Sequence, residues 1–211
     1  SFDAPLLQTR YRLHEMPVPF ADYAHLDLLH LARRLWRDRL ASRTLQSIEK
    51  EILGVKRTAE EVPGYEIPYL YFDYLRDRNA TPMKGVFYHN EIDILSLATL
   101  LNHAGEMLSN PFSKNLEHSL DVIAIAKLLE DLHRWDEAAR LYEHGLQGEL
   151  PEKDFTRAVK RLSILQRRRG DLAEAVKWWE QAANEDHIYA HVELAKYYEH
   201  RIKDFEKAQE Y

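Results

Sequence analysis

The sequence predicts a mainly helical chain whose N-terminal and C-terminal parts are built differently. Apolar residues recur at helical spacing through most of the chain, which predicts helices. Ala138, Ala175 and Ala208 close three similar segments and lie 37 and 33 residues apart, which indicates an internal repeat of helix pairs. The helix-breaking run Asn110-Pro111-Phe112-Ser113 marks the boundary between the two parts.

The composition describes an acidic, soluble protein. The chain has 211 residues, 45% of them hydrophobic and 30% charged, with a net charge of -6. Such a balance argues against broad, non-specific nucleic-acid binding and leaves room only for a local basic groove. The absence of cysteine excludes disulfides, thiolate zinc sites and cysteine nucleophiles, so we expect a cytoplasmic protein. No apolar run reaches about eighteen residues, which excludes a transmembrane helix and a membrane partner.

Helix-capping and helix-breaking residues predict the first elements of the chain. Ser1 is a suitable N-cap for a helix that runs to about Arg12, with Asp3 in its first turn, where the helix dipole favours a negative charge. The two prolines of residues 16–19 end this helix. A strand is then expected over residues 23–28.

Asp27 opens the next helix, which carries Leu31, Leu35 and Trp36. On a strand, His25 and Asp27 would face the same way, as two ligands of a metal site do, but a structural cap is the favoured interpretation of Asp27. Further helices are expected at 44–53 (ended by Gly54), 69–76 and about 82–108, with a loop over 61–68.

The run Tyr88-His89-Asn90-Glu91-Ile92-Asp93 begins the apolar periodicity of the last of these helices. On a helix, His89 and Asp93 share one face, one turn apart. An imidazole beside a metal-binding carboxylate suits metal-assisted phosphodiester hydrolysis, because the cation supplies charge and the base supplies hydroxide. The competing interpretation is a solvated helix start capped by Asn90.

Several segments, taken in order, resemble the middle of a DnaQ-like (ribonuclease-H-like) 3′→5′ exonuclease domain of the DEDD type. The resemblance is closest to the bacterial YprB-like branch, in which tetratricopeptide repeats follow this domain. It begins with Ser1-Phe2-Asp3-Ala4-Pro5-Leu6-Leu7 and ends with His89-Asn90 and Asp93-Ile94-Leu95-Ser96-Leu97. Between them it includes residues 24–35, 44–49, 53–55, 62–64, 67–68 and 71–75.

The resemblance implies the C-terminal part of an α/β domain over residues 1–109. In such exonucleases, four carboxylates from three motifs hold two divalent ions, Mg²⁺ or Mn²⁺. Asp3 corresponds to the second-motif aspartate, Asp93 to the third-motif aspartate and His89 to the general base. The first motif, an Asp-x-Glu on the opening strand, has no counterpart here, so we expect this chain to be a piece of a longer protein that carries most of the sheet upstream.

Several arginines lie close to Trp36 in the sequence and form a basic stripe on the helix after Asp27. Arg33, Arg34 and Arg37 are suited to bind the phosphates of a nucleic acid while the indole stacks on a base. A solvated helix face, with Asp38 as a partner for the arginines, explains the stripe equally well.

Residues 116–211 resemble tetratricopeptide repeats, whose period is about 34 residues. Small residues stand where paired helices touch, at Ala138, Ala175 and Ala208, and the aromatics Tyr142 and Trp179 follow four positions after the first two. The chain stops within a third repeat, so we expect further repeats after it and a protein partner for the repeats.

Two functions from different classes are consistent with these patterns. The first is a metal-dependent 3′→5′ exonuclease acting on single-stranded ends of DNA or RNA, with the present piece inactive alone. The alternative is a non-catalytic adaptor, whose repeats bind a protein partner while the nuclease-like part serves as a scaffold. The joint presence of Asp3, His89 and Asp93 favours the exonuclease.

Overall fold

A computed structural model describes residues 3–57, 62–113, 116 and 118–211. All regular structure in these residues is helical. The strand expected over residues 23–28 is wrong: this segment is a loop that leads into the next helix. A strand is stable only when its backbone groups pair with a neighbouring strand, and the described residues offer none.

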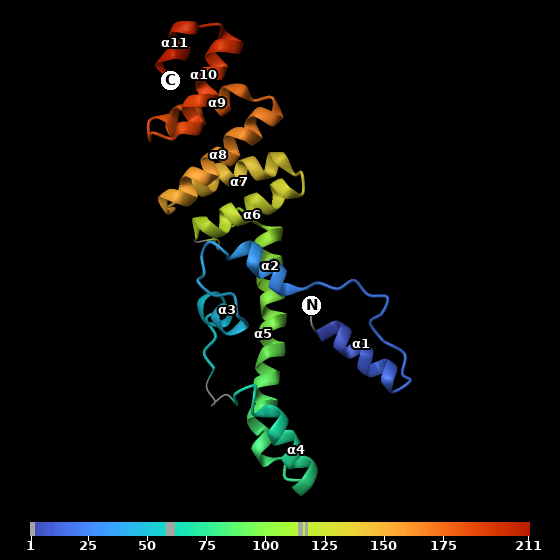
Figure 1. The fold of residues 1–211 in the computed structure, drawn as a ribbon. Helices are drawn as coiled ribbons and strands as arrows, with labels where there is room; N and C mark the ends of the chain where they lie inside the picture. Colours follow the sequence, from blue (N-terminus) through green and yellow to red (C-terminus); the bar gives the residue numbers. More distant parts are fainter. Residues whose placement is uncertain (1–2, 58–61, 114–115, 117) are drawn as a thin grey trace.

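The described residues of the N-terminal part form six helical elements: α1 (Asp3–Leu13), α2 (Leu28–Leu35), α3 (Leu45–Glu51), α4 (Ile67–Asp77), the 3₁₀ turn η1 (Thr81–Met83) and α5 (Lys84–Ser109). Asp27 caps α2, because its Oδ1 accepts a hydrogen bond of 3.0 Å from the Leu29 N–H. The 26-residue helix α5 is the long axis of this part, and α2, α3 and η1 contact it (Figure 1).

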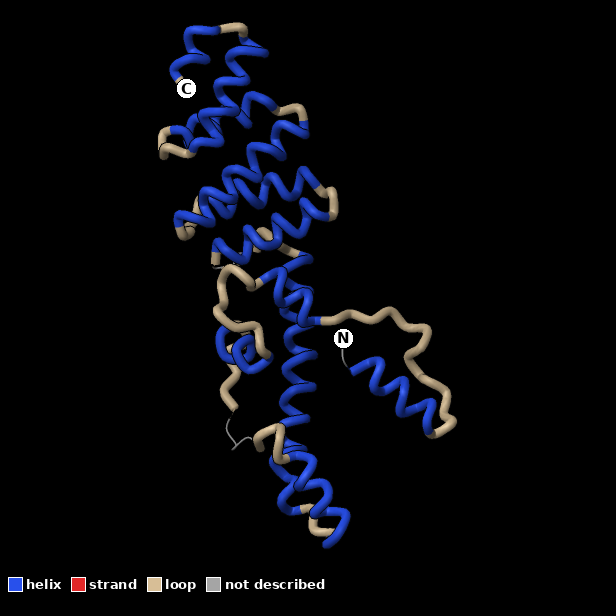
Figure 2. The backbone as a smooth tube through the Cα atoms, viewed as in Figure 1, coloured by secondary structure: helices blue, strands red, loops and turns tan. Residues whose placement is uncertain are grey.

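The C-terminal part is a stack of helices: α6 (Ser119–Asp131), α7 (Trp135–Leu146), α8 (Glu152–Arg169), α9 (Leu172–Ala183), α10 (Ile188–Tyr197), the π-helical turn η2 (Tyr198–Ile202) and α11 (Phe205–Glu210). Each of these helices packs against the next one along the chain, and Figure 2 shows the short loops that join them. Gly170 ends α8 with a φ of +82°, a conformation that favours glycine.

The small residues of the repeat lie at helix contacts, with one exception. Ala138 and Ala175 are fully buried, as expected for positions where two helices approach closely. Burial of Ala208 was also expected, and that expectation is wrong, because Ala208 is only partly buried. It lies on α11, the last helix that the structure describes.

One hydrophobic core continues from α2 and α5 into α6, α7 and α8. Leu35 and Trp36 on the N-terminal side belong to the same buried cluster as Ile125 and Leu162 on the C-terminal side. Ion pairs reinforce this contact, since Arg34 pairs with Asp131. The break at residues 110–113 therefore separates two patterns of sequence but does not divide the core.

Large apolar side chains are exposed on α4 and α5. Tyr69 and Phe72 on α4, and Phe87 and Ile94 on α5, are each more than half exposed. The principal helix packings do not include α1, which stands apart from α5 in Figure 1. Over the described ranges, we find no helix with the length and apolar character needed to cross a membrane.

Candidate functional site

His89 and Asp93 lie side by side on α5. The Nε2 atom of His89 is 3.3 Å from Oδ2 of Asp93, and both side chains are about one third exposed. The helix explains this geometry, because residues four apart lie one turn above each other on the same face. The shared face expected from the sequence is therefore present.

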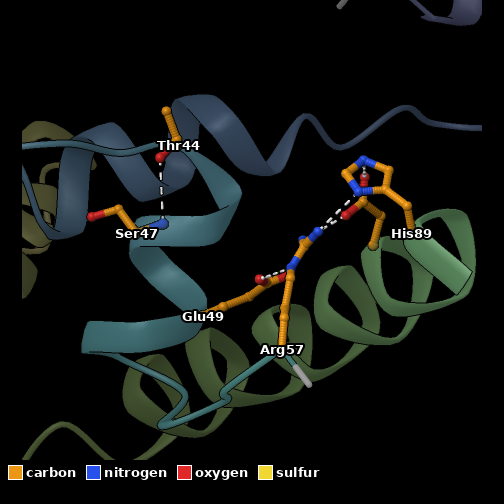
Figure 3. Close-up of polar contacts among 6 residues, drawn as sticks. Thr44, Ser47, Glu49, Arg57 and His89 are labelled. Atoms are coloured by element: carbon orange, nitrogen blue, oxygen red, sulfur yellow. Dashed lines mark hydrogen bonds and ion pairs between the residues drawn. The ribbon is translucent and has the colours of Figure 1, made fainter. Parts of the chain in front are cut away.

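Arg57 connects this pair to a buried glutamate (Figure 3). Its Nε donates to Oε2 of Glu49 at 2.6 Å and its Nη2 to Oε1 at 2.7 Å, which is the bidentate geometry of a strong guanidinium–carboxylate pair. Nη2 also donates to Oδ1 of Asp93 at 2.6 Å, and Nη1 lies 3.1 Å from Nδ1 of His89. We call Glu49, Arg57, His89 and Asp93 the Arg57 cluster.

Local structure places Glu49 and Arg57. The hydroxyl of Thr44 caps α3 by accepting from the Ser47 N–H at 3.3 Å, which fixes the start of the helix that carries Glu49. Gly54 then adopts a φ of +66°, and the Val55 N–H returns to the Glu49 carbonyl at 2.8 Å. This turn reverses the chain and places Arg57 between α3 and α5.

Charge pairing keeps Glu49 ionised although its side chain is only 1% exposed. The hydrogen bonds from Arg57 lower the pKa of Glu49, with a further contribution from Ser96, and they outweigh the opposing effect of burial. A buried carboxylate with a bidentate partner is stable only while that partner stays in place.

The tautomer of His89 follows from the chemistry of arginine. A guanidinium can donate hydrogen bonds but cannot accept them, so Nδ1 of His89 acts as the acceptor toward Arg57. The ring proton is then on Nε2, where it faces Oδ2 of Asp93. Both nitrogens of His89 therefore have a partner in this arrangement.

The described residues do not provide a complete metal site. No group of three or more histidine, aspartate, glutamate or cysteine side chains within them is arranged to hold a metal ion. Asp93 uses Oδ1 toward Arg57 and faces His89 with Oδ2. A two-metal centre needs several carboxylates, so Asp93 would need further ligands, and its contact with Arg57 would have to open.

Asp3, the other expected metal ligand, begins α1, and its side chain lies outside the part of the chain that the structure describes. Its convergence with Asp93 therefore remains a prediction.

The expected nucleic-acid-binding arginines lie on or next to α2 and face α6. Arg34 pairs with Asp131, and Nε of Arg37 is 3.6 Å from Oδ1 of Asp38. Arg33 is exposed on the same helix. These partners belong to α6 and to the turn after α2, so the structure places the arginines in a second location, separate from the Arg57 cluster.

Neither Glu49 nor Arg57 was expected in the site from the sequence. One signal was available for Glu49, because it lies next to the apolar residues Ile48 and Ile52 on a short helix, where a charge has to find a partner once it is buried. No comparable signal marked Arg57, which lies in a loop.

Comparisons with known proteins identify a superfamily match for the N-terminal part and a relative of the chain. Residues 1–105 match the RNase_H superfamily. The chain is also 37% identical to the uncharacterized protein YprB of Bacillus subtilis (strain 168) over 213 aligned residues, an alignment that includes 99% of this chain and 51% of that relative. The chain thus spans about half the length of the curated relative. No solved structure matches it.

Proposed function

We propose that this chain is the C-terminal part of a metal-dependent 3′→5′ exonuclease domain followed by tetratricopeptide-type repeats. The match of residues 1–105 to the RNase_H superfamily supports this proposal. The observation that supports this proposal best is the pairing of His89 with Asp93 on one face of α5, inside the matched region. An imidazole beside a carboxylate is a combination suited to the activation of water.

Each residue of the site has a defined task under this proposal. Asp3 and Asp93 would hold Mg²⁺ or Mn²⁺ together with carboxylates from the N-terminal segment of the longer protein. The bound ions would stabilise charge on the scissile phosphate. His89 would take the proton of the attacking water, which requires that one of its nitrogens lose its present partner.

The repeat-like stack supports a second role. Tetratricopeptide-type stacks present extended surfaces to protein partners, and the adaptor function remains the alternative for a longer protein that does not hydrolyse nucleic acid. The buried Ala138 and Ala175 at helix contacts favour this assignment of the stack.

The test uses the longer protein that contains this chain. Single-stranded DNA and RNA oligonucleotides, labelled at the 5′ end, are incubated with Mn²⁺ or Mg²⁺, and the products are separated by length. We expect a ladder of products shortened from the 3′ end. His89→Ala and Asp93→Asn should abolish the ladder.

Glu91→Gln is the matched control, because Glu91 is exposed on the same turn of α5. It should leave the ladder unchanged. Intact oligonucleotides under all of these conditions would refute the exonuclease and favour the adaptor.

A further inference from the structure

A cavity of about 230 Å³ lies between α2 and α6, at the junction of the two parts of the chain. Figure 1 shows α2 next to α6 at this junction. Six charged residues line the cavity: Arg33, Arg34, Arg37, Asp38, Lys127 and Asp131. Four of them are cationic and two are anionic, which contrasts with the acidic charge of the whole chain.

The two carboxylates of the cavity are shared among several arginines. Asp131 pairs with Arg34 and lies 3.9 Å from Nη2 of Arg161. Asp38 lies 3.6 Å from Nε of Arg37 and 3.6 Å from Nη1 of Arg157. Glu130 neutralises part of the charge on Arg161, with 2.9 Å between Oε2 and Nε.

Within the part of the chain that the structure describes, Lys127 and Arg33 are the two cations of this cavity that form no ion pair. Neither has a carboxylate within ion-pair distance among the described residues. Burial lowers the pKa of Lys127, and the positive charges of Arg37 and Arg161 lower it further. The nearby carboxylates of Asp38 and Asp131 oppose this shift but do not cancel it. Positive charge therefore accumulates in this cavity without full compensation, and a bound anion would relieve the repulsion.

Phosphate is the anion that best matches these donors. The planar guanidinium groups of Arg34 and Arg37 are about half exposed, so they can reach a ligand from solvent. Guanidinium forks match pairs of phosphate oxygens, and an ammonium group adds a point charge. Contacts of this kind hold a nucleic-acid backbone independently of its sequence.

We propose that the cavity between α2 and α6 binds a backbone phosphate of single-stranded nucleic acid, with Arg33 and Arg37 contributed by the nuclease part and Lys127 by the first helix of the repeats. The assignment rests on the proposed function, since it supplies the backbone contacts of the same substrate. Under this proposal, the repeats contact the substrate directly.

The experiment measures binding without hydrolysis. The longer protein is titrated into a fluorescent single-stranded oligonucleotide in EDTA, and the anisotropy is recorded at several salt concentrations. Lys127→Ala should weaken binding at low salt and reduce the slope of log affinity against log salt by about 0.7, the value for one phosphate contact on a single strand. Lys127→Arg, which keeps the charge, should restore the slope.

Lys177→Ala is the control, because Lys177 is exposed on α9 and pairs with Glu174. It should behave as wild type, and thermal unfolding checks that every variant is folded. An unchanged slope in Lys127→Ala would overturn the proposal while leaving the exonuclease intact.

A second titration with inorganic phosphate separates the two sources of the ligand. Binding of inorganic phosphate that depends on Lys127, with an unchanged oligonucleotide slope, would assign the cavity to free phosphate and refute the nucleic-acid site. A longer protein that neither binds nor shortens oligonucleotides would instead refute the proposed function itself.

Discussion

Arg57 is the residue that holds the candidate site together. It contacts a buried carboxylate on α3 and both candidate functional side chains on α5. In this arrangement its guanidinium occupies one oxygen of Asp93 and the lone pair of Nδ1 of His89. Arg57 therefore positions both groups, and it also competes for them with any cation that the longer protein binds at Asp93.

Replacing Arg57 should lower the free energy of unfolding and change how that free energy depends on pH. Arg57→Gln leaves Glu49 buried without its partner, a loss of about 3–5 kcal/mol in the free energy of unfolding. In the wild type, the lowered pKa of Glu49 contributes stability that is present above its ordinary value and lost as the pH falls through the lowered value. Urea unfolding over a series of pH values measures both effects.

The sign of this pH dependence should reverse at Glu49 in the variant. Without Arg57, burial raises the pKa of Glu49, so the folded state binds the proton more readily than the unfolded state and stability increases as the pH falls. Arg12→Gln, an exposed position on α1, serves as the control. An Arg57→Gln variant with wild-type stability and the wild-type pH slope would contradict the bidentate pair.

At the scale of elements, the C-terminal stack is held by close contacts between successive helices. Ala175 on α9 is fully buried, and it shares a core with Val159 on α8 and Leu194 on α10. Trp179 fills the same core one turn further along α9. Small and large residues thus alternate along one helix face, which lets neighbouring helices approach without leaving a cavity.

A bulky residue at Ala175 should therefore destabilise the stack. Ala175→Leu adds volume to a contact with no spare space, and overpacking of this kind costs roughly 1–3 kcal/mol. Thermal unfolding gives the measurement. Ala173→Leu, an exposed position on the same helix, should leave the melting temperature nearly unchanged; equal melting temperatures for the two variants would show that the repeat register is misassigned.

At the scale of the whole molecule, the N-terminal part exposes several large apolar side chains. Tyr69, Phe72, Phe87 and Ile94 are exposed on α4 and α5, and large exposed apolar patches mark surfaces that bind another part of a protein. The curated relative is about twice as long as this chain. We expect the longer protein to cover these side chains and to contribute further carboxylates to the site.

The isolated 211-residue chain should therefore bind Mn²⁺ weakly and lack exonuclease activity. The expected ligands in it are Asp3 and Asp93, too few carboxylates to offset the repulsion between two divalent ions. Isothermal titration with Mn²⁺ and the oligonucleotide ladder assay, each run on the chain and on the longer protein, make the comparison. Robust metal-dependent cleavage by the chain alone would mean that the site is misplaced, with Glu91 or Asp27 as substitute ligands.

Local features of this protein followed from the sequence. The helices near residues 27–36, 44–53 and 82–108 and the common face of His89 and Asp93 depend on residues within a few turns of each other, and helical spacing indicates them. The cap at Asp27 depends on the carboxylate at the start of its helix. Tertiary structure decided the features that depend on distant residues: the position of Arg57 between Glu49 and α5, the contact of α2 with α6, and the incomplete burial of Ala208. Charge pairing and burial there require segments that are remote in sequence to meet, and residue spacing carries no information about which segments do so.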